Sequence, residues 1–100
     1  MEIKKEFFDN FEKLQNFKSK PKLNDFFEII YKLEKIETEI KINPQKSKQD
    51  SAKLIKQAQD LARKLEINRD EFAMRTKTQK EFEAVYKCID CLGEHFNSLN

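Results

Sequence analysis

The sequence predicts an all-α protein, a small bundle of four or five antiparallel amphipathic helices forming a single domain over residues 1–100. One Gly and two Pro in 100 residues are too few for the turns of a sheet protein, and 38 % of the residues are charged. Apolar residues recur at steps of three and four along most of the chain, as in helices with one buried face. A chain of this length has room for only one hydrophobic core, so we expect no second domain.

The first predicted helix covers residues 3–18 and has one apolar face. That face carries Ile3, Phe7, Phe11, Leu14 and Phe17. Ser19-Lys20-Pro21 ends the helix, because proline does not continue it. Acidic residues outnumber basic ones on the opposite face, whereas helices that bind membrane surfaces favour positive charge. We therefore expect this helix to pack in the core.

The second predicted helix, residues 24–42, has the longest apolar stripe, and we expect the rest of the chain to pack around it. Its stripe consists of Phe26, Ile29, Leu33, Ile36 and Ile40. Asp25 and Glu28 have the spacing of a capping box at its start. Asn43-Pro44 ends it, since the residue before a proline avoids helical geometry.

Residues 43–50 are polar and predict the longest loop, and a third helix over 51–66 follows it. The inward face of this helix carries Leu54, Ala58, Leu61 and Leu65, with Ile55 and Ala62 beside them. Two alanines on that face, Ala58 and Ala62, would allow a neighbouring helix to approach closely.

Residues 68–97 form either one long helix or a short helix followed by a longer one. The apolar positions Phe82, Val85, Ile89, Leu92 and Phe96 keep helical spacing, but the same face carries polar Arg75 and Gln79 further back. Asn68 with Glu71 and Thr78 with Glu81 are two start signals. We therefore favour helices over 68–76 and 79–97.

The sequence predicts a cytoplasmic protein without a membrane segment. No apolar run approaches the ~18 residues of a membrane span, and acidic residues occupy the start of the chain where a signal peptide would be apolar. Cys88 and Cys91 lie three residues apart on a predicted helix, which is poor geometry for a structural disulfide. We expect both cysteines to be reduced.

Catalytic and metal-binding patterns are weak in this sequence. Cys88, Cys91 and His95 fall on one side of a helix, but zinc usually takes four ligands and the chain has no other Cys or His. No nucleophile elbow, phosphate-binding glycine loop or Glu-x-x-His pair occurs. We therefore expect no enzyme activity, no metal or cofactor, and no small-molecule substrate.

One stretch, residues 61–76 (LARKLEINRDEFAMRT), resembles the helix-turn-helix of bacterial and phage DNA-binding regulators. Ala62 stands at the small position of that motif, and Asn68 would cap its second helix. The apolar positions are Leu61, Leu65, Ile67 and Phe72. Glu66 departs from the usual turn glycine, and Arg75 replaces a usual aliphatic residue.

The resemblance implies which residues would meet nucleic acid. Facing the bases would be Asn68, Arg69, Asp70, Ala73, Met74 and Lys77, with Lys64, Arg75 and Lys80 near phosphates. Residues 41–80 hold eleven Lys/Arg against five Asp/Glu, which suits a polyanion. Asp70 and Glu71 would be repelled by the phosphates, however, and a helical hairpin can use the same packing chemistry without binding DNA.

Aromatic residues give the leading functional hypothesis. We expect a cluster of phenylalanines at one end of the bundle that cannot all point inward: Phe7, Phe8, Phe17, Phe26 and Phe27. Large aromatics at a surface commonly mark interfaces. The sequence thus predicts a non-enzymatic interaction module that acts as an adaptor, inhibitor or regulator on a protein partner or a second copy, of the kind that phages and mobile elements use. A nucleic-acid-binding regulator is the alternative.

Overall fold

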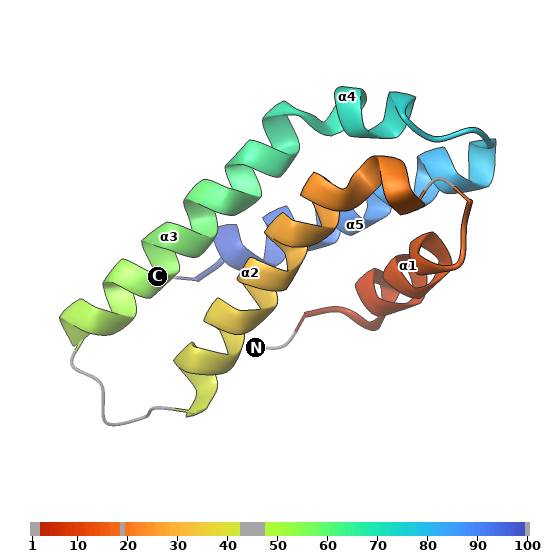
Figure 1. Ribbon diagram of the computed structural model, residues 1–100. Coiled ribbons are helices and arrows are strands. Elements are labelled where there is room, and N and C mark those ends of the chain that lie inside the picture. Colours follow the sequence, from red (N-terminus) through yellow and green to blue (C-terminus); the bar gives the residue numbers. More distant parts are fainter. Residues whose placement is uncertain (1–2, 19, 43–47, 100) are drawn as a thin grey trace.

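A computed structural model describes residues 3–18, 20–42 and 48–99, which form five α-helices and one short 3-10 helix (Figure 1). The elements are α1 (Lys5–Gln15), the 3-10 helix η1 (Lys20–Leu23), α2 (Asn24–Ile42), α3 (Lys48–Ile67), α4 (Arg69–Met74) and α5 (Gln79–Asn97). These described residues contain no strand, and the predicted all-α bundle is confirmed. The short-plus-long arrangement of the last two helices is also confirmed.

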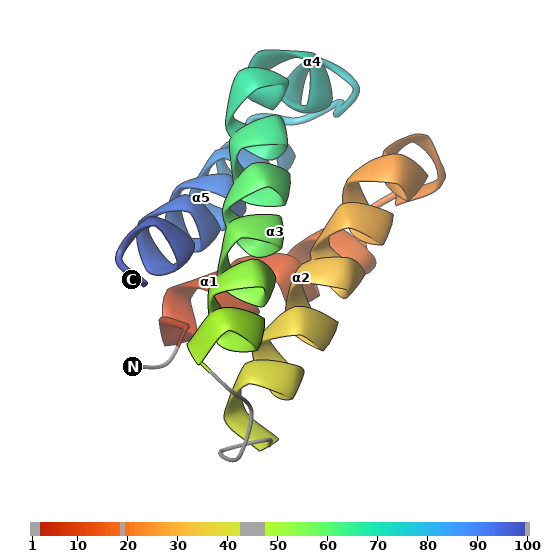
Figure 2. The same ribbon diagram turned by 90° about the vertical axis from the view of Figure 1, so that its left-hand side faces the viewer.

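The helices form an elongated bundle of 45 × 22 × 21 Å. Figures 1 and 2 show α2 and α3 side by side, with α5 on the far side of this pair. The connection between α1 and α2 and the connection between α4 and α5 lie at the same end of the bundle (Figure 1). Segments far apart in the sequence therefore meet at that end.

The central element is α5 rather than α2, which corrects the prediction that the chain packs around residues 24–42. Three helices pack on α5, namely α1, α3 and α4, whereas α2 packs chiefly on α3 and η1. Five α5 side chains are completely buried: Val85, Cys88, Ile89, Leu92 and Phe96. A helix covered from three sides holds more of the core than one with a longer apolar stripe at the edge.

The buried face of α2 also differs from the predicted stripe in its second half. Ile36 and Ile40 are only partly buried, and Glu37 is buried instead. Its carboxylate Oε2 lies 2.7 Å from Nε2 of His95 on α5, so a polar pair takes the place of an aliphatic contact. A buried carboxylate is tolerated because it has this partner.

Three helix-start signals were predicted, at Asp25, Asn68 and Thr78, and the structure confirms the one at Thr78. At the start of α5 the Thr78 hydroxyl accepts a hydrogen bond from the Glu81 N–H (3.2 Å), and the Glu81 carboxylate accepts one from the Lys77 N–H (3.0 Å). The predicted Asn68 cap is wrong, because its side-chain amide donates backward to the Lys64 carbonyl (2.9 Å).

Other boundaries shift by a few residues. Helix α1 is shorter than predicted, and α3 begins at Lys48 rather than Ser51. Residues 43–47 of the predicted loop lie outside the described part. None of the helices in residues 3–18, 20–42 and 48–99 combines the length and apolarity needed to cross a membrane.

Candidate functional site

An open apolar groove lies between α2 and α3, and we call it the α2–α3 groove. Its volume is about 480 Å³. Ile36 of α2 and Leu54 and Leu61 of α3 provide its apolar lining, and each is only partly buried. The α3 residues Ala58, Ala62 and Leu65 are buried in the core, whereas Leu54 and Leu61 lie at its margin.

Charged and polar residues border this groove on both sides. The α2 side carries Lys32, Lys35 and Glu39, and the α3 side carries Gln57 and Asp60. The Lys32 Nζ atom lies 3.6 Å from Oε1 of Glu28, one helical turn earlier in α2. Lys35 forms no ion pair within the described residues. The site can therefore hold an apolar segment that bears acidic groups on the side facing α2.

The phenylalanines proposed as an interface are mostly part of the core. Phe7 and Phe26 are completely buried and Phe27 is only 4 % exposed, so these three offer almost no surface to a protein partner. Phe17 packs partly against the core, and Phe8 alone among the five is well exposed, at 49 %. The predicted interface set of five phenylalanines is therefore wrong for Phe7, Phe26 and Phe27, and only Phe8 and Phe17 remain as surface candidates.

The buried phenylalanines pack against one another between helices. The Phe26 ring lies 5.7 Å from Phe27 and 5.3 Å from Phe72 of α4, measured between centroids. Phe11 of α1 contacts Phe27 in the same way at 5.4 Å. These rings join α1, α2 and α4, because each helix contributes the aromatic residues of its inner face.

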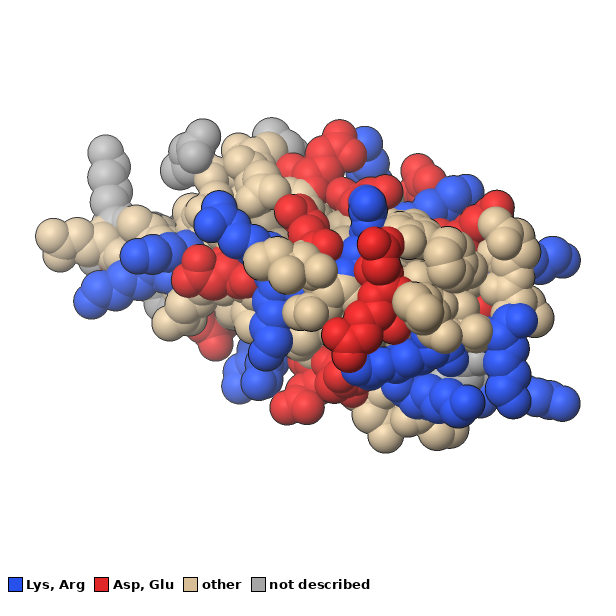
Figure 3. All heavy atoms as spheres, turned by 90° about the horizontal axis from the view of Figure 1, so that it is seen from above, with Lys and Arg blue, Asp and Glu red and all other residues tan. Residues whose placement is uncertain are grey.

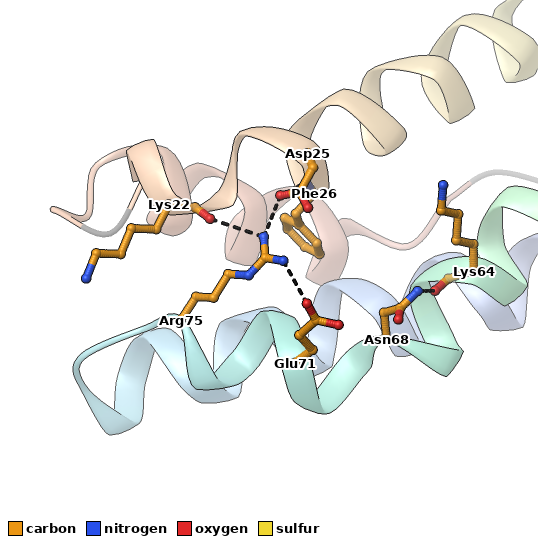
Figure 4. Close-up of polar contacts among 7 residues, drawn as sticks. All are labelled: Lys22, Asp25, Phe26, Lys64, Asn68, Glu71 and Arg75. Carbon is orange, nitrogen blue, oxygen red and sulfur yellow. Dashed lines mark hydrogen bonds and ion pairs between the residues drawn. The ribbon is translucent and has the colours of Figure 1, made fainter.

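Arg75 sits at the corner between α4 and α2 and is engaged by protein groups (Figure 4). Its Nη1 lies 2.6 Å from Asp25 Oδ1, and its Nη2 lies 3.0 Å from Glu71 Oε1. Nη1 also donates to the Lys22 carbonyl at 3.3 Å. Hydrogen bonds to the two carboxylates raise the pKa of Arg75. This arginine fastens α4 to η1 and α2, which accounts for a polar residue at a position where the helix-turn-helix has an aliphatic one.

Arg69 is engaged in a similar way on the other side of α4. Its Nη1 lies 3.2 Å from Asp90 of α5, and its guanidinium is 4.8 Å from the centre of the Tyr86 ring. The Tyr86 hydroxyl donates to Asp70, and this hydrogen bond raises the pKa of Tyr86. Two residues that would face bases in a helix-turn-helix thus bind α5.

The remaining helix-turn-helix candidates separate into buried and exposed groups. Ala73 is completely buried, so its predicted role at the bases is wrong. Ile67 is 75 % exposed and does not hold the two helices together as predicted. Lys64, Met74, Lys77 and Lys80 are exposed, and Asn68 is partly buried. The second helix of the motif has only six residues here.

The structure also gathers lysines that the sequence did not connect. The segment with Lys18, Lys20 and Lys22 lies at the same end of the bundle as the segment with Lys77 and Lys80 (Figure 1). A hydrogen bond from Arg75 to the Lys22 carbonyl joins the two segments. Only Lys77 and Lys80 were sequence candidates. The sequence did carry a signal for this basic surface, because residues 13–22 contain four lysines and no acidic residue.

Cys88, Cys91 and His95 are all buried on α5. Both cysteines are free thiols, and the Cys88 thiol donates to the Phe7 carbonyl (3.8 Å). Burial raises the pKa of each thiol, which suppresses the reactive thiolate. The Nε2 atom of His95 is hydrogen-bonded with the Glu37 carboxylate. Within the described residues, no group of three or more His, Cys, Asp or Glu side chains could hold a metal ion.

Comparison with protein families, curated proteins and solved structures gives no match for this chain. The functional proposals below therefore rest on the geometry and chemistry of the described residues.

Proposed function

We propose that the protein is a small helical interaction module that binds an amphipathic helix of a partner protein in the α2–α3 groove. The observation that supports this most is the apolar lining of Ile36, Leu54 and Leu61, left open between two charged borders. An amphipathic helix laid in a groove between helices is a recurring mode of peptide recognition. The proposed role is binding, as an adaptor, inhibitor or regulator.

The dimensions and charges of the groove favour a particular occupant. Leu54 and Leu61 are seven residues apart, which is two helical turns or about 10 Å along α3. A bound helix would fill this length with apolar residues at positions i, i+3 or i+4, and i+7. Lys32 and Lys35 on one border favour acidic residues on the flank of that helix which faces α2.

A second copy of the chain fits this groove less well than a different protein. Five large apolar residues are well exposed in the described part: Phe8, Tyr31, Ile42, Ile67 and Met74. They are spread over α1, α2, α3 and α4, and no described helix carries more than two of them, so they do not form a continuous apolar face that could fill the groove of another copy. The occupant is therefore proposed to be a helix of another protein.

Photo-crosslinking in the native host cell tests the proposal. A benzoylphenylalanine at Gln57 would lie in the groove, and the same group at exposed Lys87 on α5 would serve as the matched control. We expect the Gln57 position alone to form an adduct, and the crosslinked peptide to be amphipathic with acidic residues on one flank.

Three results would reject the proposal. They are equal adducts from both positions, an adduct only with a second copy of this chain, and a crosslinked segment without apolar residues at helical spacing. Circular dichroism of each variant establishes that the substituted protein is folded.

A further inference from the structure

Five exposed lysines gather at the end of the bundle where α1 meets α2 and α4 meets α5, and we call this surface the lysine end. Lys18, Lys20 and Lys22 come from the segment around η1, Lys77 lies between α4 and α5, and Lys80 lies in the first turn of α5. The two segments are held together by the hydrogen bond from Arg75 to the Lys22 carbonyl. Figure 4 shows the Lys22 side chain extending away from Arg75.

The acids near the lysine end, namely Asp25, Glu71, Glu81 and Glu83, are engaged by groups other than the side chains of its five lysines. Asp25 and Glu71 are both held by Arg75, which neutralises part of their charge. Glu81 is buried, and its carboxylate accepts a hydrogen bond from the Lys77 N–H. No ion pair involves any of the five lysines across residues 3–18, 20–42 and 48–99. In the view from above, Lys and Arg side chains gather at the lower right of the molecule, at the same end (Figure 3).

A groove with an aromatic lining begins at this surface. It has a volume of about 490 Å³, and Lys20 lies on its border together with Lys32 and Lys35. Phe27 and Tyr31 line it, and Tyr31 is 49 % exposed. The Tyr31 ring is braced edge-on against Phe11, with 6.0 Å between centroids. One acid, Glu28, borders the groove and lies 3.6 Å from Lys32.

We infer that the lysine end and this aromatic groove together bind single-stranded nucleic acid. Lysines attract a phosphate backbone without reading its sequence, and an exposed aromatic ring offers a platform on which an unpaired base stacks. A duplex keeps its bases stacked inside, so Tyr31 favours a single strand. This site differs from the helix-turn-helix candidates in using Lys18, Lys20, Lys22 and Tyr31.

The number of lysines sets the expected salt dependence. For single strands the logarithm of affinity falls with the logarithm of salt concentration by about 0.7 per phosphate contacted. Five contacts therefore predict that affinity weakens about 100-fold between 50 and 200 mM KCl. A site formed mainly by apolar contacts would change little over this range.

Fluorescence anisotropy with a labelled 20-nucleotide oligothymidine tests the inference. The first variant combines Lys18→Gln, Lys20→Gln and Lys22→Gln, and the matched control combines Lys5→Gln, Lys53→Gln and Lys56→Gln, three exposed lysines on α1 and α3 outside this end. Both triples remove the same charge. We expect at least tenfold weaker binding from the first triple and less than a twofold change from the control.

Two further variants examine the other parts of the site. Lys77→Gln with Lys80→Gln should also weaken binding, since these residues reach the same end from the other segment. Tyr31→Leu should weaken it about tenfold, because stacking on one aromatic ring contributes about 1–3 kcal/mol per base. Leucine keeps the apolar contact with Phe11, so the folded state is retained.

The inference is overturned by absence of binding at 50 mM KCl, or by equal losses in the two lysine triples. Tighter binding of a duplex of the same length would reject the single-strand assignment. Displacement of the oligonucleotide by polyglutamate at equal charge concentration would reject nucleic acid in favour of an acidic protein surface. Gln57 and the α2–α3 groove take no part in these variants, so this test and the crosslinking test fail independently.

Discussion

Replacing Arg75 by alanine should destabilise the protein by about 2 kcal/mol, because this residue joins α4 to η1 and α2. The variant loses contacts to Asp25, Glu71 and the Lys22 carbonyl, together with a guanidinium 5.1 Å from the centre of the Phe72 ring. The two carboxylates are more than half exposed, so each ion pair contributes only about 0.2–1 kcal/mol. The carbonyl bond adds about 1 kcal/mol and the ring contact about 0.5 kcal/mol.

Urea unfolding followed by circular dichroism measures this loss. With a slope of about 2 kcal/mol per M, the midpoint of the Arg75→Ala variant should fall by about 1 M. Arg75→Lys should recover less than half of the loss, because an ammonium cannot bridge two carboxylates as the planar guanidinium does. A double-mutant cycle with Asp25→Ala should give a coupling energy of about 0.5–1 kcal/mol.

The result that refutes this reasoning is an Arg75→Ala midpoint within about 0.2 M of the wild-type value, which corresponds to less than about 0.5 kcal/mol. Arg75 would then be free to act elsewhere, as its position in the helix-turn-helix pattern implies. A loss that persists unchanged in 1 M NaCl would also contradict the assigned ion pairs, since salt screens exposed charges.

Three further substitutions or treatments test other parts of the structure. Glu37→Ala should cost about 1–3 kcal/mol in urea unfolding, because it leaves the buried His95 ring without its partner, and a neutral result would contradict that pairing. Gly93→Ala should raise the melting temperature by about 4 °C, because alanine has the higher helix propensity. The new Cβ would lie 2.0 Å from Glu66 Oε1, but the Glu66 side chain is exposed and can move away. A lower melting temperature would show that Glu66 is fixed. Burial raises the pKa of Cys88, so at pH 8 its alkylation should follow unfolding; rapid alkylation of the folded protein would contradict its burial.

Helical spacing and start signals in the sequence predict most of the elements. Thr78 with Glu81 marked the start of α5, and the hydrogen bonds of both residues confirm it. Arg75 and Gln79 on an otherwise apolar face indicated the break before α5. These signals are local, since a helix start depends on residues within one turn.

Features that depend on which helices meet were not predictable in this way. Spacing identifies an apolar face but not the number of helices that cover it, so α2 was expected at the centre and α5 is found there. Glu37 looked like a solvated residue until its partner His95, 58 positions later, was placed beside it. The lysine end likewise combines two segments that are more than 50 residues apart, and an Arg75 contact brings them together.

The α2–α3 groove was also beyond sequence reasoning. Ile36, Leu54 and Leu61 carried the pattern of core residues, and all three were expected on the buried faces of their helices. Their partial exposure reflects which part of each helix is covered, since Ala58, Ala62 and Leu65 of α3 are buried while Ile36, Leu54 and Leu61 border an open groove. An apolar face therefore predicts burial, but not whether the chain itself supplies the covering helix.

The most direct test of the proposed function is a binding titration with a synthetic peptide of the segment that crosslinks to Gln57. Leu54→Gln removes part of the apolar lining, Lys35→Glu reverses one charged border, and Lys87→Glu on α5 makes the same charge change away from the groove. The account predicts at least tenfold weaker binding for the first two variants and wild-type affinity for the third, with all three folded. Unchanged affinity for Leu54→Gln and Lys35→Glu would contradict it.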